Sequence, residues 1–151
     1  MSAKLPRPSP LSPADFQTVV RLAPLVSIDL IIRNAQGEIL LGLRANEPAK
    51  GFYFVPGGIV LKHERLRDAF ARILKRETNC DGRIEDARLL GAFEHFYETN
   101  SFGDAAFGTH YQALANSVLD IGYGFVSRRS LTDTTGNRRA FDHPRSIFVS
   151  I

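Results

Sequence analysis

The stretch that decides the fold runs from Glu64 to Asn79 and reads ERLRDAFARILKRETN. Wound as a helix, it places its apolar side chains on one stripe and most of its charged side chains on the opposite side. The stripe comprises Leu66, Ala69, Phe70, Ile73 and Leu74, and the charged side comprises Arg65, Asp68, Arg72, Lys75 and Arg76. Glu77 is the exception, because it falls within the apolar stripe, four residues beyond Ile73. A carboxylate on a core-facing stripe is costly unless it is neutralised, paired or bound to a metal ion.

A segment with two glycines lies upstream of this helix. It reads Val55-Pro56-Gly57-Gly58, which is typical of a turn. Glycine has no side chain, so the backbone of such a turn can approach a metal ion closely. The pattern therefore predicts a metal site built from one helix and one glycine loop, with Glu77 as its carboxylate. The alternative is that Glu77 lies in the frayed last turn of the helix and reaches water, and periodicity alone does not decide between the two.

The spacing of charged residues around Glu77 favours the metal site. Five residues separate Gly58 from Glu64, seven separate Glu64 from Arg72, and four separate Arg72 from Glu77. This arrangement resembles the Nudix box, the loop and helix signature of the Nudix hydrolases. In that family the glutamates of the box lie on one helix face and hold magnesium ions.

Departures from the box indicate one subfamily. Ile73 and Arg76 stand where an ordinary box has glutamates, and Asn79 stands where it has glycine. A box that keeps only its last glutamate resembles that of the GDP-mannose mannosyl hydrolases. Further motifs occur in the order of that subfamily over residues 12–112. They are Thr18-Val19-Val20-Arg21, Pro24 to Asp29, Leu40-Leu41-Gly42-Leu43-Arg44, Gly51 to Gly58, Glu94-His95-Phe96-Tyr97 and Thr109-His110-Tyr111.

The resemblance implies both a fold and a reaction. The fold is α/β, a Nudix-type α/β/α sandwich with a mixed β-sheet and a loop and helix metal site. The cofactor is Mg²⁺, held by Glu77 and the carbonyl oxygen of Gly57. The substrate is GDP-mannose or a related GDP-hexose, from which water releases GDP by attack at the anomeric carbon. A homodimer is also implied by the family.

Length and composition agree with one domain. The 151 residues are 44% hydrophobic, so we expect a flexible segment over residues 1–11 and a single Nudix domain over residues 12–151, with 112–151 atypical. One cysteine, Cys80, excludes an internal disulfide and fits a reducing compartment. There is no membrane-spanning run, and the proline-rich segment from Lys4 to Pro13 is no signal peptide, so we expect a cytoplasmic protein. The net charge of +3 favours an anionic ligand, and no pattern indicates nucleic-acid binding.

Local patterns predict the helices and strands that surround the box. Ser12-Pro13 is a helix start, with serine as the N-cap, and the helix leads to Arg21. Two further runs form a β-hairpin around a turn at residues 34–37, and three more strands follow. The hairpin strands are Val26 to Arg33 and Glu38 to Ala45, and the others are Tyr53 to Val55, Ala87 to Tyr97 and Thr109 to Val118.

Four residues are candidates for substrate binding. Arg44 ends a hairpin strand beside the glycine segment, where a guanidinium can clamp a diphosphate, although an exposed strand-end arginine is the plain alternative. Asp29 matches a position in the nucleotide pocket of the subfamily, but it alternates with apolar residues and can equally face solvent. His95 and Tyr111 match positions that line the substrate site. Among the histidines, His95 and His110 are the candidates for catalysis.

Arg72 has two interpretations of equal weight. The resemblance places it beside the diphosphate, where it would assist catalysis. However, Arg72 shares a helix face with Asp68 and Glu64, which precede it by four and eight residues. A purely structural ladder of ion pairs fits that spacing as well.

The general base of the subfamily is missing from its expected place. The resemblance implies a histidine, preceded by a metal-binding glutamine, before a Tyr-Arg-Trp strand whose nearest match is Tyr123-Gly124-Phe125. Leu119 and Asp120 stand there instead. Asp120 is therefore the candidate base at that place, although a carboxylate is weaker than histidine at neutral pH. Ile59 likewise replaces an arginine that would assist the leaving diphosphate.

Two rival functions stay open. A protein that binds nucleotide sugars with little or no catalysis fits the missing base. A Nudix pyrophosphohydrolase that attacks phosphorus is less consistent with the sequence, because Ile73 and Arg76 leave too few carboxylates for several metal ions.

Overall fold

The computed structural model describes residues 6–119 and 146–149, and only the backbone of 146–149. Asp120 and the expected strand at residues 123–125 lie outside the described residues, and the single-domain boundaries stay a prediction. Among the described residues no helix is long and apolar enough to cross a membrane. The elements are α1 (Pro13–Leu22), β1 (Leu25–Arg33), β2 (Ile39–Leu43), β3 (Tyr53–Phe54), β4 (Gly57–Ile59), α2 (Leu66–Thr78), the 3₁₀ turn η1 (Ile84–Asp86), β5 (Arg88–Tyr97), β6 (Thr109–Leu119) and β7 (Ser146–Val149).

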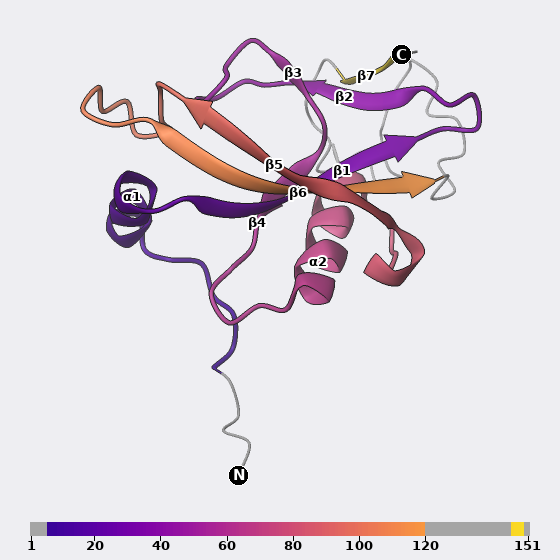
Figure 1. The fold of residues 1–151 in the computed structure, drawn as a ribbon, viewed down its shortest axis with the longest axis horizontal. Helices are drawn as coiled ribbons and strands as arrows, with labels where there is room; N and C mark the ends of the chain where they lie inside the picture. Colours follow the sequence, from indigo (N-terminus) through magenta and orange to yellow (C-terminus); the bar gives the residue numbers. More distant parts are fainter. Residues whose placement is uncertain (1–5, 120–145, 150–151) are drawn as a thin grey trace, which may run out of the picture.

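The sheet is mixed, as predicted, and β1 lies near its middle (Figure 1). β1 runs parallel to β6 along its whole length, from Leu25 opposite Tyr111 to Arg33 opposite Leu119. β5 is antiparallel to β6. The other edge of β1 is shared, because β4 pairs with the start of the strand and β2 with its end. β3 and β7 then pair with β2.

Helix α1 begins where the sequence predicts. The hydroxyl of Ser12 accepts a hydrogen bond from the backbone N–H of Asp15 at 3.2 Å, and Pro13 is the first helical residue. This is the N-cap arrangement that satisfies a free N–H of the first turn. The helix lies beside β6 and the loop that precedes it, where the rings of Phe16 and Phe102 are 5.8 Å apart (Figure 1).

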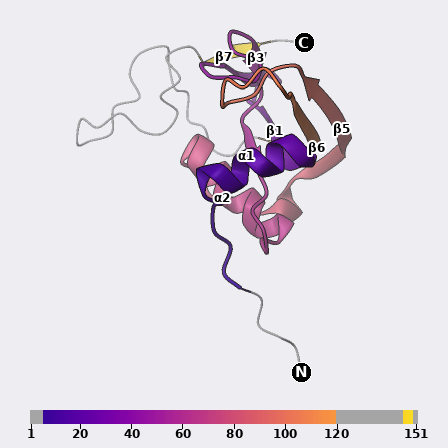
Figure 2. The ribbon, with the colours of Figure 1, turned by 90° about the vertical axis from the view of Figure 1, so that its left-hand side faces the viewer.

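The core lies between α2 and one face of β1. Alternate side chains of β1 are buried against the apolar stripe of α2, which packs across the sheet (Figure 2). The predicted stripe is confirmed except at Leu66, which is 44% exposed because it is the first residue of the helix. The buried partners are Ile28, Leu30 and Ile32 from β1 and Ala69, Phe70, Ile73 and Leu74 from α2.

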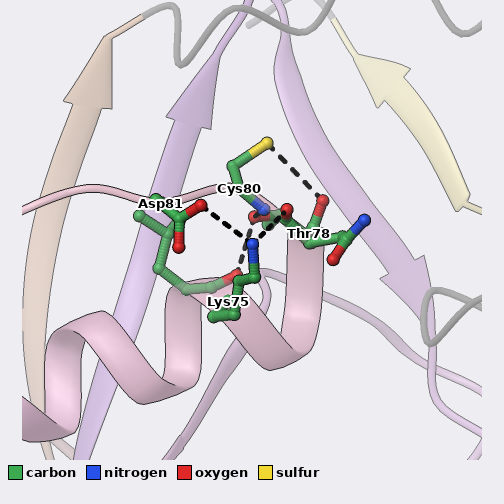
Figure 3. Close-up of polar contacts among 6 residues, drawn as sticks. Lys75, Thr78, Cys80 and Asp81 are labelled. Carbon is green, nitrogen blue, oxygen red and sulfur yellow. Dashed lines mark hydrogen bonds and ion pairs between the residues drawn. The ribbon is translucent and has the colours of Figure 1, made fainter.

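Helix α2 continues past Glu77 and ends in a hydrogen-bonded cap (Figure 3). Asn79 adopts a left-handed conformation with φ of 58°, and its N–H donates to the carbonyl of Lys75. The hydroxyl of Thr78 donates to the backbone carbonyl four residues earlier at 2.7 Å. Lys75 Nζ lies 2.9 Å from Asp81 Oδ2. Glu77 therefore belongs to an ordered last turn.

The glycine segment is a strand, which corrects the predicted turn. Gly57–Ile59 forms β4 and pairs with Ser27 to Asp29 of β1. Gly57 is needed for close approach, because a Cβ there would lie 2.7 Å from the backbone carbonyl oxygen of Ile28, whereas a Cβ at Gly58 would meet only side chains of α2. Pairing with a distant strand, which a local pattern does not reveal, overrides the turn signal.

Candidate active site

Polar residues gather on the face of the sheet opposite α2. Asp29 points away from the core because its neighbours in β1, Ile28 and Leu30, point into it. His95 of β5 and Tyr111 of β6 are directly paired across the two strands, so they share one face. His95 Nε2 lies 4.0 Å from Asp29 Oδ2. The structure thus brings together three residues that the sequence singled out separately.

Arg44 joins this group from the residue that follows β2. Its backbone is fixed on both sides, because its N–H donates to the carbonyl of Phe52 and its carbonyl accepts from the N–H of Gly51. The guanidinium lies 5.3 Å from the ring centre of Phe54, and its Nε donates to the carbonyl of Asn46 at 3.2 Å. Its charge acts on both the Asp29 carboxyl and the Tyr111 phenol, so this cation can bind an anionic group beside them.

Burial sets the acid–base character of the group. It raises the pKa of the Asp29 carboxyl above its ordinary value, and the charges of His95 and Arg44 oppose the rise. Burial also raises the pKa of the Tyr111 phenol, and the charge of Arg44 opposes the rise. A carboxyl with a raised pKa beside an imidazole is suited to proton transfer nearer neutral pH.

Tyr97 is a site residue that the sequence reasoning missed. Its ring stacks with that of His95 at 6.3 Å and meets the ring of Tyr111 edge-on at 6.1 Å. Tyr97 thereby contacts the rings of both predicted residues. A signal for it exists in the sequence, because Tyr97 follows His95 by two residues and must share its strand face.

Of the two candidate metal ligands, Gly57 lies beside this group and Glu77 lies on α2. Gly57 is paired with Asp29, and a Cβ on Gly57 would be 3.0 Å from Asp29 Oδ1. Glu77 of α2 is 21% exposed at its side chain, and Arg76 Nε lies 2.8 Å from its Oε1. Arg76 Nη2 also donates to the carbonyl oxygen of Gly57 at 3.3 Å. The carboxylate and the carbonyl therefore converge on one cation.

The oxygen atoms of Gly57 and Glu77 fit a divalent metal ion. Carboxylate and carbonyl oxygens are the ligands that Mg²⁺ prefers, and two from the protein suffice when substrate phosphates supply others. The Arg76 guanidinium is a stand-in cation between Gly57 and Glu77. Within residues 6–119 no cluster of three or more His, Cys, Asp or Glu side chains offers a competing metal site. The donor set thus fits an ion that a bound diphosphate helps to hold.

The placement of Arg76 is a correction to the sequence analysis. It was expected on the solvent side of the helix, but its guanidinium reaches back to β4. The helical repeat explains the difference, since Arg76 follows buried Ile73 by three residues and Ala69 by seven. Those intervals place it at the border of the buried stripe rather than opposite to it.

Arg72 is engaged in a latch between α2 and the loop after β4. Its Nε and Nη2 atoms donate to Glu64 Oε1 and Oε2 at 2.6 and 2.7 Å, and Nη2 also donates to the carbonyl of Ile59 at 2.9 Å. Glu64, whose side chain is 4% exposed, accepts a further hydrogen bond from the N–H of Leu61. Asp68, the other expected partner, lies nearest to Arg67 at 3.8 Å.

His110 lies away from the polar group. Neighbouring residues of a strand face opposite ways, so His110 and Tyr111 occupy opposite faces of β6. The ring of His110 stacks on Phe96 at 4.2 Å, and its Nε2 lies 3.2 Å from the amide nitrogen of Gln112. Of the two candidate histidines, His95 is the one beside Asp29.

The comparisons with known proteins concern the family and the fold. A family profile described as NUDIX domain matches residues 23–136. The chain belongs to the Nudix family. Nudix hydrolases generally use divalent metal ions. The MutT protein from Methanosarcina mazei Go1 has a TM-score of 0.57 at 20% identity, over 84% of this chain and 78% of that chain, which confirms the predicted Nudix fold.

Two relatives match over part of their length. The low-salt glycan biosynthesis protein Agl8 of Haloferax volcanii is 46% identical over 104 residues, which are 69% of this chain and 64% of that protein. The ADP-ribose pyrophosphatase of Methanocaldococcus jannaschii is 38% identical over 72 residues, which are 48% of this chain and 41% of that protein. This Nudix chain therefore matches less than two thirds of either relative.

Proposed function

We propose that this Nudix protein hydrolyses GDP-mannose or a related GDP-hexose to GDP and the free sugar. The observation that carries the proposal is the pairing of two subsites: the Asp29 and His95 pair can deprotonate a water that attacks the anomeric carbon, and the adjacent Arg44 can hold a diphosphate. The 46% identity to a protein named for glycan biosynthesis supports a nucleotide sugar as the substrate.

The reaction requires a leaving group to be stabilised and a water to be deprotonated. A water oxygen bonds to the anomeric carbon, and the bond from that carbon to the diphosphate oxygen breaks, with its electron pair retained by GDP. Arg44 and the hydroxyl of Tyr111 face the developing charge on the diphosphate. His95, oriented by Asp29, accepts the proton of the water.

Gly57 and Glu77 are the residues that would hold Mg²⁺ in this proposal. When bound, the ion supplies charge neutralisation on the diphosphate. One carboxylate at this place favours attack on carbon, because attack on phosphorus in this family relies on several ions held by several glutamates. Arg72 then acts as a positioning residue, since it fixes the loop between β4 and α2.

The product pattern in ¹⁸O-labelled water tests the proposal. The full chain is incubated with GDP-mannose and Mg²⁺, and the masses of the separated products are determined by mass spectrometry. We expect GDP without label and mannose with one labelled oxygen. Label in a phosphate, or mannose 1-phosphate with GMP, would overturn the proposed bond cleavage.

A pyrophosphohydrolase is the second candidate function. It is favoured by the 38% identity to an ADP-ribose pyrophosphatase. The same assay with ADP-ribose measures AMP release, which the first proposal does not predict. Binding of GDP-mannose without turnover would instead indicate a nucleotide-sugar-binding protein.

Asp120 stays the alternative base, and loss of activity in Asp120→Asn but not in His95→Gln would assign that role to it.

A further inference from the structure

The expected metal ligands are already bound to a positive charge that belongs to the protein. Arg76 Nε lies 2.8 Å from Glu77 Oε1, and Arg76 Nη2 lies 3.3 Å from the carbonyl oxygen of Gly57. Gly58 provides the space for this, because a Cβ there would lie 2.6 Å from Nη2. The guanidinium is thus seated on β4 between the two oxygen ligands. An arginine and a metal ion cannot occupy this place together.

We propose that Arg76 is a built-in competitor for the divalent metal ion at Gly57 and Glu77, so that the ion enters together with the substrate. The inference rests on the proposed role of these two residues as metal ligands. Without substrate, Arg76 neutralises Glu77 and keeps metal affinity low. A bound diphosphate adds oxygen ligands for the ion and offers the displaced guanidinium a new anionic partner.

The contacts of Arg76 suit a group that moves. Its side chain is 53% exposed, and an exposed ion pair of this kind is weak. By contrast, the neighbouring Arg72 donates to a carboxylate that is 4% exposed and to a backbone carbonyl. Arg72 is therefore held in place, whereas Arg76 can leave its position at little cost.

Metal titration of the full chain without nucleotide tests the competition. Mn²⁺ binding is measured by the electron spin resonance of the free ion, in the wild type, in Arg76→Ala and in Arg67→Ala. Arg67 is the matched control, because it is an exposed arginine of α2 that pairs only with Asp68 among the described ion pairs. We expect Arg76→Ala to bind Mn²⁺ about five- to tenfold more tightly, and Arg67→Ala to resemble the wild type. Equal affinity in Arg76→Ala and the wild type would overturn the inference.

A second pair of variants separates this inference from the proposed metal site. Arg76→Ala combined with Glu77→Gln should lose the affinity gained in Arg76→Ala, because the amide has no charge for the ion. If Glu77→Gln has no effect in either background, the ion does not bind at Glu77, and both the site and the competition fail. If Glu77→Gln weakens binding but Arg76→Ala does not strengthen it, only the competition fails.

The coupling to substrate has its own readout. GDP should raise the Mn²⁺ affinity of the wild type by a larger factor than that of Arg76→Ala, since the variant has no competitor left to displace. The two factors are compared in the same titration at saturating GDP. An equal factor in both proteins would show that Arg76 does not couple metal entry to the diphosphate.

Discussion

His95 and His110 belong to neighbouring strands, but only His95 lies within reach of a carboxylate. His95 Nε2 is 4.0 Å from Asp29 Oδ2, whereas His110 stacks on Phe96 on the other face. We expect His95→Gln to lower kcat by about 10²-fold or more, because a positioned base typically contributes that much. KM should change little. Steady-state kinetics with GDP-mannose provides the measurement.

His110→Gln is the matched control for that change. It removes the same imidazole from the adjacent strand, but from the face opposite His95 and Tyr111. We expect its kcat to stay near that of the wild type. A lowered kcat in His110→Gln, with a normal kcat in His95→Gln, would contradict the assignment of His95 as the base.

Asp29 makes the stability of the protein depend on pH in a defined direction. Burial raises the pKa of its carboxyl above 3.8, so the folded chain keeps the proton to a higher pH than the unfolded chain. The free energy of unfolding therefore falls as the pH rises through the folded pKa, and this loss is absent below the unfolded value. Asp29→Asn removes the titration, so its stability relative to the wild type should increase as the pH rises above about 4.

Urea unfolding of the two proteins over that pH range checks this expectation. Turnover by Asp29→Asn should fall at the same time, because the amide orients His95 less well. Stability curves that stay parallel across the whole range would show that the Asp29 carboxyl does not have a raised pKa.

The latch between β4 and α2 gives Arg72 a structural role that can be measured. Arg72→Ala removes both guanidinium nitrogens that donate to Glu64, whose side chain is 4% exposed in the wild type. We expect a loss of about 2–3 kcal/mol in the free energy of unfolding, which is the cost of an unpaired buried acceptor. Arg67→Ala should lose less than about 0.5 kcal/mol, as exposed substitutions do.

The pH dependence of this latch has the opposite sign to that of Asp29. The hydrogen bonds from Arg72 lower the pKa of Glu64 below 4.5 and outweigh its desolvation. The stabilisation is thus complete above pH 4.5 and is lost as the pH falls through the folded pKa. In that acid range the free energies of unfolding of Arg72→Ala and the wild type should become equal. If Arg72→Ala is as stable as the wild type but has a raised KM for GDP-mannose, direct contact of Arg72 with the diphosphate is favoured instead.

Elements with their own local signals could be predicted from the sequence. α1 carries its N-cap at Ser12, and α2 carries its stripe and a left-handed stop at Asn79, so both were placed to within two residues. β4 could not be found in this way, because Gly57 and Gly58 read as a turn until β1 pairs with them. Hydrogen bonding to a distant strand leaves no local pattern.

The same distinction applies to the candidate site. Asp29, His95 and Tyr111 were chosen by resemblance, one at a time. Their meeting depends on the parallel pairing of β1 with β6, in which each residue pairs with one 86 positions later, and no motif encodes this contact. The charge of Arg76 predicts a position facing solvent, whereas its three-residue interval from Ile73 places it at the border of the buried stripe.

The molecule as a whole presents an apolar edge at β5. Within the described part of the chain, this strand ends the sheet, and its exposed side chains include Leu89 at 61%, Phe93 at 49% and Phe96 at 70%. Such an edge invites pairing with another surface. We therefore expect the homodimer implied by the family, and sedimentation equilibrium should give twice the mass of the chain. A single-chain mass at all accessible concentrations would contradict it.

The two faces of β1 affect how the ligand preference of this protein can evolve. Ile28 and Leu30 belong to the core, while Asp29 between them belongs to the candidate site. A mutation at residue 29 therefore alters ligand preference without opening a hole beneath α2. New specificities are accessible by single steps through folded intermediates. A library varied at residues 29 and 111, with His95 kept, should accordingly yield a high proportion of well-expressed members with altered ligand binding.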